Sequence, residues 1–570
     1  MTNYKVIVED RNYNKWDFCN ANTFDKLELV DIQPLEKKLF NNDIFQVSKK
    51  NEVNIIHSSI RVGGEIPGVL IIKDNKTYGR KKGKLMYKCI PDDMRIPAFL
   101  VPYEIKHVGF SKVFTNIYVT FSFDHWDDKH PHGLLKQVIG PVDILDNYYE
   151  YQLYCKSLNS SIQKFTKETS KSLKLNSHDA FIDNICLKYP TLEDRTSWNV
   201  FTIDGPTTTD YDDAFSIKTL ENGNYCLSVY ISNVTIWMDV LNLWSSFSQR
   251  ISTIYLPDRK RPMLPTILSD CLCSLQSGNS RIAFLMDIII SKDYSILEIK
   301  YANAKIKVFK NFIYDEPDLL KNNSYQTLFS ITEEISKKYK YISSIRNSND
   351  VVAYLMILMN YHTSTKMLEF KNGIFRSSII QTKVDLPSNL PDDVGNFVKV
   401  WNSSICQYVD GSNIQVKHEI LNIDSYIHIT SPIRRLVDLL NIIKFQQNTQ
   451  MIVLSDKSND FYEQWIKQLD YINVTMRAIR KVQNDCSLLD TCCNNPEIME
   501  KLYDGYSFDK LERNDGLFQY IVYLPELKLV SRITSRENMI NFEKQHYKLF
   551  LFHNEDRFKK KIRLQLLKTV

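Results

Sequence analysis

Residues 202–216 read "TIDGPTTTDYDDAFS", which places four aspartates within ten positions: Asp204, Asp210, Asp212 and Asp213. Like charges held close together repel each other, and burying them without partners costs several kcal/mol. A doubly charged cation among the four carboxylates would offset that cost. The stretch therefore predicts a metal site, with an ordinary acidic surface loop as the alternative.

Two features favour the metal site. The stretch directly follows an apolar segment, "WNVFTID" (198–204), which is typical of a strand and could hold a site rigidly. An extended Asp-x-Asp-Asp run also puts Asp210 and Asp212 on one side. Four hard oxygen donors suit Mg²⁺, and two such ions about 3.5–4 Å apart would clamp the attacking and leaving oxygens of a phosphodiester. An EF-hand is disfavoured, because no glycine and terminal glutamate fall at the required loop positions.

The composition limits the class of protein. The chain has 570 residues, 43% of them hydrophobic and 12% aromatic, which is enough for roughly four domains. We expect no membrane span, since no run of about 18 apolar residues occurs, and no secretory signal. The 11 cysteines are scattered without C-x-x-C pairs, so we expect reduced thiols and a cytoplasmic location. A net charge of only +5 means that a nucleic-acid partner would need local basic patches, which we expect at Arg80, Lys81 and Lys82 and in the tail at Lys559–Lys561.

Shifts in pattern along the chain predict its organisation. Near both ends of the chain, short segments with alternating apolar and polar residues are separated by turn residues, which indicates short strands. In the middle, longer apolar strands are followed by helical stretches. The expected division is an unassigned segment (1–45), two small β-barrels (46–98 and 99–146), a helical connector (147–197), a large α/β unit (198–495) and a third small barrel with a basic tail (496–570).

Two further segments stand out. "YLPDRKRPMLPTILSDCLCSL" (255–275) combines three prolines with a basic run and predicts a stiff strap, or else a plain surface loop. In "YIHITSPIRRLVDLL" (426–440), Ser431-Pro432 indicates a helix start with Arg434 and Arg435 in its first turn. Cations are unfavourable at a helix N-terminus, so these arginines are better explained if they face phosphates or the acidic stretch.

Other motif searches favour no further site. "GRKKGKL" (79–85) has the wrong spacing for a P-loop. A zinc site at His125, His130 and His132 is less favoured than plain turn residues.

Taken in their order along the chain, the three segments resemble the signature segments of the ribonuclease II family, the RNB exoribonucleases. Upstream, "DDMRIPAFLVPYE" (92–104) and "HWDDKHPHGLLKQVIGPV" (125–142) resemble the cold-shock-type OB barrels of eukaryotic-type members. The resemblance covers about residues 50–490. It implies a multidomain fold with N-terminal OB-type β-barrels, a central α/β RNB catalytic domain and a C-terminal OB-type β-barrel that binds RNA.

The resemblance also implies a function. Members of the family hydrolyse RNA processively from the 3′ end and release nucleoside 5′-monophosphates with Mg²⁺. Carried over to this chain, Asp204, Asp210, Asp212 and Asp213 are the metal-site residues, and Asp212 is the one on which cleavage depends. Arg434 supports the scissile phosphate, as a catalytic and RNA-binding residue. We expect a monomer that takes the 3′ end of single-stranded RNA and spares DNA.

The family likeness implies one more RNA-binding residue, Tyr255, which would stack near the last bases. By base rate, however, a tyrosine in the apolar stretch "ISTIYLP" (251–257) is more often a core aromatic.

The chain also departs from the family pattern. Gly205 stands where a proline is usual, and Leu436 stands where an aromatic residue is usual. The stretch Gln483-Asn484-Asp485 replaces a Glu-Arg-Asp-like run, which would reduce turnover if that glutamate assists catalysis. The alternative to an enzyme is therefore an RNB-fold RNA-binding regulator. The intact set of four aspartates favours the enzyme.

Overall fold

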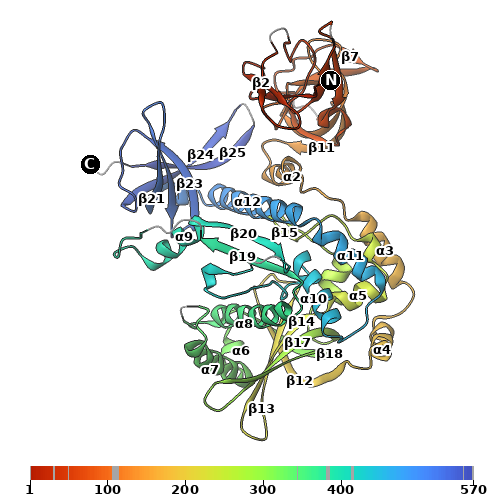
Figure 1. Cartoon of the computed structure of the whole chain (residues 1–570), viewed down its shortest axis with the longest axis vertical. Coiled ribbons are helices and arrows are strands. Elements are labelled where there is room, and N and C mark those ends of the chain that lie inside the picture. Colours follow the sequence, from red (N-terminus) through yellow and green to blue (C-terminus); the bar gives the residue numbers. More distant parts are fainter. Residues whose placement is uncertain are drawn as a thin grey trace.

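The structure is a computed structural model that describes residues 2–29, 32–48, 50–105, 114–342, 344–380, 385–412, 416–555 and 558–567. Figure 1 shows an elongated molecule with the N-terminal sheets at one end and a barrel with its covering helices at the other. The C-terminal sheet lies beside the long helix α12 (Leu469–Asn494). Small β-sheets around a central α/β unit agree with the predicted fold class.

Most of the first sheet comes from residues 1–45, which we left unassigned, and its last strand comes from the start of the predicted first barrel (46–98). It has five antiparallel strands in the order β3-β2-β1-β4-β5. Its strands are short and only partly buried, so their sequence alternates weakly. The strands are β1 (Tyr4–Val8), β2 (Trp16–Asn20), β3 (Lys26–Leu27), β4 (Ile44–Val47) and β5 (Val53–His57), and the short helix α1 (Ser59–Val62) follows.

The second sheet is a ring. Strand β6 pairs with both β10 and β8, which closes five strands into a small barrel with β7 at its margin. The expected boundary at 98/99 falls between the paired neighbours β8 and β9, and the one at 45/46 falls inside β4, so neither matches the sheets. The strands are β6 (Ile66–Leu70), β7 (Arg80–Lys81), β8 (Lys84–Pro91), β9 (Phe99–Tyr103), β10 (Ile117–His125) and β11 (His132–Pro141).

The connector is helical, in agreement with the spacing seen from residue 147 onward. Its first helix packs tyrosines toward the second sheet, where the rings of Tyr118 and Tyr151 stack with centroids 4.2 Å apart. The helices are α2 (Leu145–Cys155), α3 (Gln163–Leu173) and α4 (His178–Lys188).

The central unit is built on a closed barrel of five strands. All neighbours are antiparallel except β12 and β18, which pair in parallel. Both faces of β14 and β17 are buried, which explains their nearly continuous apolar sequence. The strands are β12 (Glu193–Asp204), β13 (Asp213–Thr219), β14 (Tyr225–Ser232), β17 (Ser280–Ile290) and β18 (Ile296–Ile313).

Helices cover the barrel. A two-stranded antiparallel sheet, β19–β20, lies beside the helices α9 and α12. One hydrophobic cluster joins Val229 and Ile231 of β14 to Leu355 of α8. The remaining elements are α5 (Val234–Val240), η1 (Trp244–Ser246), α6 (Pro317–Leu320), α7 (Asn323–Lys338), α8 (Ser348–Glu369), β19 (Ile374–Ile380), α9 (Asp392–Asn402), β20 (Ser403–Asp410), η3 (Glu419–Leu421), α10 (Leu436–Asn448), α11 (Asp456–Ile466) and α13 (Glu497–Glu500).

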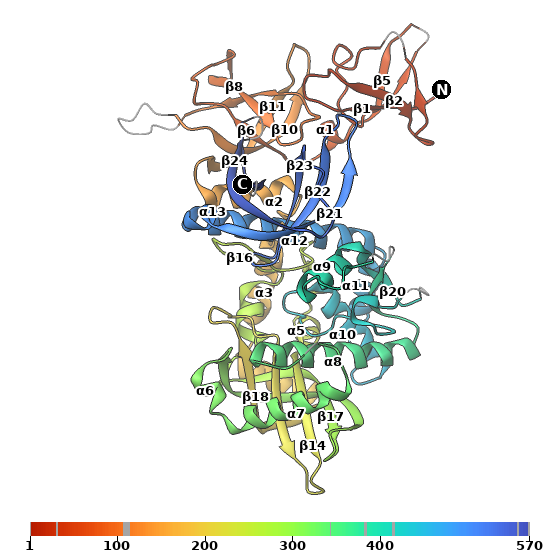
Figure 2. The same ribbon diagram turned by 90° about the vertical axis from the view of Figure 1, so that its left-hand side faces the viewer.

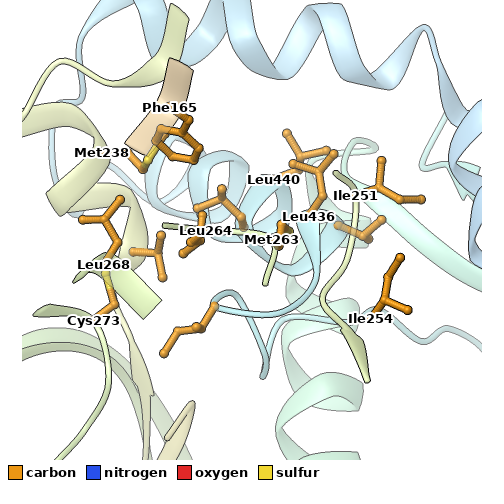
Figure 3. Packing of buried hydrophobic residues seen from close by; sticks show 14 of the residues in the cluster. Phe165, Met238, Ile251, Ile254, Met263, Leu264, Leu268, Cys273, Leu436 and Leu440 are labelled. Atoms are coloured by element: carbon orange, nitrogen blue, oxygen red, sulfur yellow. The ribbon is translucent and has the colours of Figure 1, made fainter. Parts of the chain in front are cut away.

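The strap begins earlier than the predicted residue 255. The apolar side chains of residues 250–275, which we call the strap from here on, are packed into the core, so the strap is not a plain surface loop. Figure 3 shows Met263 of the strap close to Leu436 of α10, and Leu268 on the other side of Leu264, toward Met238 and Cys273. All of these side chains are buried in one cluster. The packing fixes the small hairpin that the strap forms and the π-helical turn after it. These elements are β15 (Ile254–Tyr255), β16 (Lys260–Arg261) and η2 (Ile267–Leu272).

The C-terminal sheet lies close to the second sheet in Figure 2, and named contacts join the two. Tyr118 donates a hydrogen bond to the carbonyl oxygen of Phe558 (2.9 Å), and Lys559 pairs with Asp92 (2.6 Å). The strand order of the C-terminal sheet is β23-β22-β21-β24-β25. The strands are β21 (Leu502–Glu512), β22 (Phe518–Leu524), β23 (Leu529–Ser535), β24 (Lys544–Asn554) and β25 (Lys559–Leu566).

Within the described ranges, no helix has both the length and the apolar character needed to cross a membrane. The 11 cysteines are free thiols, as we predicted.

Candidate active site

A cavity of about 820 Å³ brings the predicted site residues together. All four aspartates line it, together with Tyr255 of the strap and Arg434, which lies more than 200 positions away in the sequence. The tertiary structure thus joins the three segments that stood out in the sequence.

The barrel positions the acidic stretch. Asp204 is the last residue of β12, and Asp213 is the first residue of β13, so the loop between the two strands carries Asp210 and Asp212. The loop is tied down on both sides. The backbone N–H of Ser232 donates to the carbonyl oxygen of Asp212 (2.8 Å), and that of Tyr314 donates to the carbonyl oxygen of Asp204 (3.0 Å).

Asp212 is buried, and both of its carboxylate oxygens are engaged. Oδ1 accepts from the backbone N–H of Ile433 (2.8 Å), and Oδ2 accepts from Nε of Arg434 (3.1 Å). Burial raises the pKa of Asp212 to about 7, although the Arg434 charge acts in the opposite direction. At neutral pH this carboxyl is close to its own pKa, as is common at functional sites.

Asp210 is held by the strap. Lys260 Nζ donates to its Oδ1 (2.9 Å), and the hydroxyl of Tyr255 donates to its Oδ2 (3.1 Å). Burial and the neighbouring Asp210 charge raise the pKa of Tyr255, so the hydroxyl keeps its proton and acts as a donor. Tyr255 and Lys260 are cross-strand partners in the β15–β16 hairpin, which explains why both reach the same carboxylate.

Asp204 and Asp213 differ from the other two aspartates. Oδ2 of each is buried, and it has no hydrogen-bond partner in the part of the chain that the structure describes. Burial raises the pKa of Asp204 to about 7. Burial and the Asp204 charge hold the pKa of Asp213 well above its usual range. The Arg434 charge acts in the opposite direction on both groups but does not outweigh burial, so two neighbouring carboxylates without an ion pair are unfavourable unless a proton or a cation joins them.

The donor chemistry of this pair fits a divalent cation, since both unpartnered atoms are hard carboxylate oxygens. In the described ranges, no group of three or more His, Cys, Asp or Glu side chains is arranged to hold a metal ion. Protein donors occupy both oxygens of Asp210 and of Asp212. That the four aspartates form a metal site therefore stays a prediction.

Arg434 and Arg435 precede the helix, so our prediction that they lie in its first turn is wrong. Helix α10 begins at Leu436, and Arg435 is its N-terminal flanking residue. Arg435 pairs with Asp438 in the first turn (2.9 Å), which removes the conflict with the helix dipole. Arg434 donates from Nη2 to Ser431 Oγ (2.9 Å), and its side chain remains 43% exposed toward the cavity.

The Tyr255 side chain is not a core aromatic. It is 40% exposed and lines the cavity, whereas its neighbour Ile254 is buried. The alternation of a two-residue strand sends the two side chains to opposite faces. The exposed ring is free to stack on a base, and the stacking role of Tyr255 stays a prediction.

Several cavity residues were not predicted from the sequence. Asn360, Tyr426 and His428 also line the cavity; Tyr426 and His428 belong to the segment 426–440, but we had assigned them no role, and Asn360 lies outside every segment that we singled out. The amide of Asn360 donates to the Tyr426 hydroxyl (3.0 Å), and Tyr408 contacts His428 Nδ1 (2.7 Å). The only signal was the alternation in "YIHIT" (426–430) just before the arginines. Among the described cavity-lining residues, none belongs to the stretch 483–485.

The basic surfaces expected to bind RNA are only partly available. Lys559 is buried in its ion pair with Asp92, and Lys81 pairs with Asp124, so neither offers a free charge. Arg80 and Lys82 line a separate open pocket of about 490 Å³ on the second sheet.

Comparison with known proteins points to the same family. The family model described as RNB domain matches residues 192–370, less than half of the chain. Ribonuclease R of Chlamydia pneumoniae is 25% identical over 304 residues, which cover 42% of this chain and 45% of that protein. Exoribonuclease 2 of Aeromonas hydrophila is 38% identical over 125 residues, or 22% of this chain and 18% of that protein. The matches thus span less than half the length of these curated relatives.

Solved structures extend the likeness of fold to nearly the whole chain. Mycoplasma genitalium RNase R, in complex with ribose methylated single-stranded RNA, matches with a TM-score of 0.69 at 16% identity, over 99% of this chain and 100% of that one. Yeast Ssd1, described as a pseudonuclease, matches with a TM-score of 0.58 at 14% identity, over 96% of this chain and 80% of that one. The predicted family and fold class are confirmed.

Proposed function

We propose that this chain is a metal-dependent exoribonuclease that hydrolyses single-stranded RNA processively from its 3′ end and releases nucleoside 5′-monophosphates. One observation carries the proposal: Asp204 and Asp213 line the cavity beside the Arg434–Asp212 pair, and each has a buried carboxylate oxygen with no hydrogen-bond partner among the described residues. The names of the relatives, ribonuclease R and exoribonuclease 2, support the same reaction class.

The aspartates and Arg434 have different roles in this proposal. Asp204 and Asp213 would hold a divalent cation, Mg²⁺ in our proposal, which when bound supplies Lewis-acid activation of water and offsets phosphate charge. Asp212 fixes Arg434 through Nε, and in the described ranges Nη1 of Arg434 contacts no acceptor. Nη1 would therefore face the scissile phosphate and offset the negative charge that develops there.

The strap would determine where the RNA end stops. The ring of Tyr255 is exposed in the cavity, while its hydroxyl is fixed on Asp210. A ring held in this way can stack on a base near the cation site, which contributes about 1–3 kcal/mol in single-strand binding. We further propose that the protein acts as a monomer and spares DNA, since the 2′-hydroxyl distinguishes RNA.

The second candidate is an RNB-fold protein that binds RNA without cutting it. The observation that favours it is that protein donors hold both oxygens of Asp210 and of Asp212, as in a site that needs no metal.

A single assay separates the two candidates. A 5′-labelled RNA of about 30 nucleotides is long enough to reach beyond one OB-type sheet, which covers roughly 4–16 nucleotides. It is incubated with the protein with and without Mg²⁺, and the products are resolved on a gel. The enzyme shortens the RNA from its 3′ end only with Mg²⁺, and chromatography detects nucleoside 5′-monophosphates. Binding without shortening in either condition refutes the enzyme and supports the regulator.

A further inference from the structure

Lys260 lies at the floor of the cavity with its ammonium group fully satisfied. Nζ donates to Asp210 Oδ1 (2.9 Å), Asp270 Oδ1 (3.0 Å) and Thr209 Oγ1 (2.6 Å). An ammonium group has three N–H donors, so each has one acceptor. The side chain is only 24% exposed, and it lies between two carboxylates that are themselves mostly covered. This is the arrangement of a built-in counter-ion and not that of a solvated surface lysine.

The fold holds this lysine in place from two sides. On one side, Lys260 pairs across the β15–β16 hairpin with Tyr255, whose hydroxyl binds the same Asp210. On the other, Asp270 lies in the π-helical turn η2, which buries Leu268 and Leu272 against the core (Figure 3 shows Leu268).

Asp270 is itself fixed by further contacts. Ser269 Oγ donates to its Oδ1 (2.5 Å), and Thr209 Oγ1 donates to its Oδ2 (3.1 Å). The amide of Gln276 also donates to its backbone carbonyl oxygen (2.6 Å). The carboxylate that shares Lys260 with Asp210 therefore cannot turn away without breaking several hydrogen bonds.

The charges of the site fall into two halves. Lys260 pairs with Asp210 and Asp270, whereas no ion pair is formed by Asp204 or Asp213 within the described ranges, where Arg434 is the cation that acts on them from nearby. Phosphodiester sites can hold two cations. With both Asp212 oxygens engaged by Ile433 and Arg434, Asp210 is the remaining carboxylate of the acidic stretch that could bind the second one. Here such a cation would have to displace an ammonium group that already has three acceptors.

We propose that Lys260 is the resident cation of the Asp210 side, so that the site takes one divalent cation, at Asp204 and Asp213, and Lys260 stands where a second one would bind. Lys260 is a positioning residue, because it acts through Asp210 and the Tyr255 hydroxyl. The inference rests on the proposed function only in requiring a divalent cation at the first position.

The test counts bound cations and does not depend on cleavage. Metal-free protein is titrated with Mn²⁺, and free Mn²⁺ is measured by electron paramagnetic resonance. The wild type should bind one Mn²⁺. Lys260→Met keeps the length of the stem without its charge, and it should bind two. Lys260→Met combined with Asp270→Asn should bind one again, because the second position then lacks a carboxylate.

The controls separate the two proposals. Lys218→Met removes a lysine that lies over the Trp198 ring, 3.7 Å from its centroid and outside the cavity lining, and it should leave one site. Thermal unfolding checks that each variant folds. If Lys260→Met does not fold, the number of Mn²⁺ ions bound by the wild type still tests the proposal. Two sites in the wild type, or one in a folded Lys260→Met, overturn the role of Lys260. No bound Mn²⁺ in the wild type overturns the metal-dependent function as well.

Discussion

Asp212→Asn should abolish RNA cleavage and at the same time make the metal-free protein more stable. The amide keeps the shape of the side chain and an oxygen that can accept from the Ile433 N–H, but it cannot carry the negative charge. Its closest counterpart is the protonated carboxyl. Replacing Asp212 therefore resembles protonating it permanently, and the pKa of Asp212 gives the size of the effect.

The magnitude follows from linkage. Burial raises the pKa of Asp212 from 3.8 to about 7, and each unit corresponds to about 1.4 kcal/mol. The folded state therefore keeps a proton that the unfolded state has lost between about pH 4 and about pH 7. The contribution of Asp212 to the free energy of unfolding of the wild type therefore falls as pH rises through this window and levels off above it. At pH 8 Asp212→Asn should be more stable by up to about 4 kcal/mol, and near pH 4 the difference should vanish.

The assay is urea unfolding in EDTA at several pH values, followed by tryptophan fluorescence. Asp287→Asn is a matched control, since Asp287 is another buried aspartate bonded to an arginine, with Arg195 Nη1 at 2.8 Å and Nη2 at 2.6 Å. The Arg195 side chain is only 5% exposed, whereas that of Arg434 is 43% exposed. Removing the partner of a buried arginine costs about 3–5 kcal/mol, so the control should be destabilised.

The reasoning is refuted if Asp212→Asn is no more stable than the wild type at pH 8, or if the difference does not change with pH. Wild-type rates of RNA cleavage by Asp212→Asn would refute its assignment to the site.

The other predictions concern how RNA is held. Tyr255→Ala should cut long RNA at nearly the wild-type rate but leave longer end products, whereas Tyr255→Phe should leave wild-type products; unchanged product lengths for Tyr255→Ala on a gel would contradict stacking. Arg434→Lys should lower kcat at least 10-fold with RNA affinity retained, because lysine cannot bind Asp212 and a phosphate through separate nitrogens; kcat within two-fold of the wild type, a factor worth about 0.4 kcal/mol, would contradict this role. RNA affinity should fall as salt rises. Replacing Arg80 and Lys82 by alanine should flatten the slope of log affinity against log salt by about 0.7 for each lost phosphate contact. Filter binding at four salt concentrations measures the slopes, and equal slopes for variant and wild type would contradict the prediction. Lys559→Ala should instead lower the unfolding temperature, because it leaves Asp92 without its partner; calorimetry checks it, and an unchanged midpoint would count against the pair.

Local sequence predicted those parts of the fold in which pattern and packing agree. Strands β12 and β17 were expected from their apolar runs, because both faces of a barrel strand are covered. The N-terminal sheet was missed, since its strands are short and half-exposed and their side chains alternate too weakly. The helix start at Ser431 was placed too early, because the sequence does not show that backbone contacts with the strap hold Arg434 and Arg435 before α10.

Residue types and their local spacing were enough to predict a chemistry for the site. Four aspartates within ten positions, a proline-rich basic strap and an arginine pair resemble one family, and the RNB match over residues 192–370 agrees with that reading. Only the tertiary structure decided how the charges are paired. Lys260 turns toward Asp210 and Asp270, and Arg434 turns toward Asp212, so Asp204 and Asp213 keep the unpartnered oxygens. Hydrogen bonding between residues up to 222 positions apart depends on how the barrel, strap and α10 pack, and no local pattern encodes that packing.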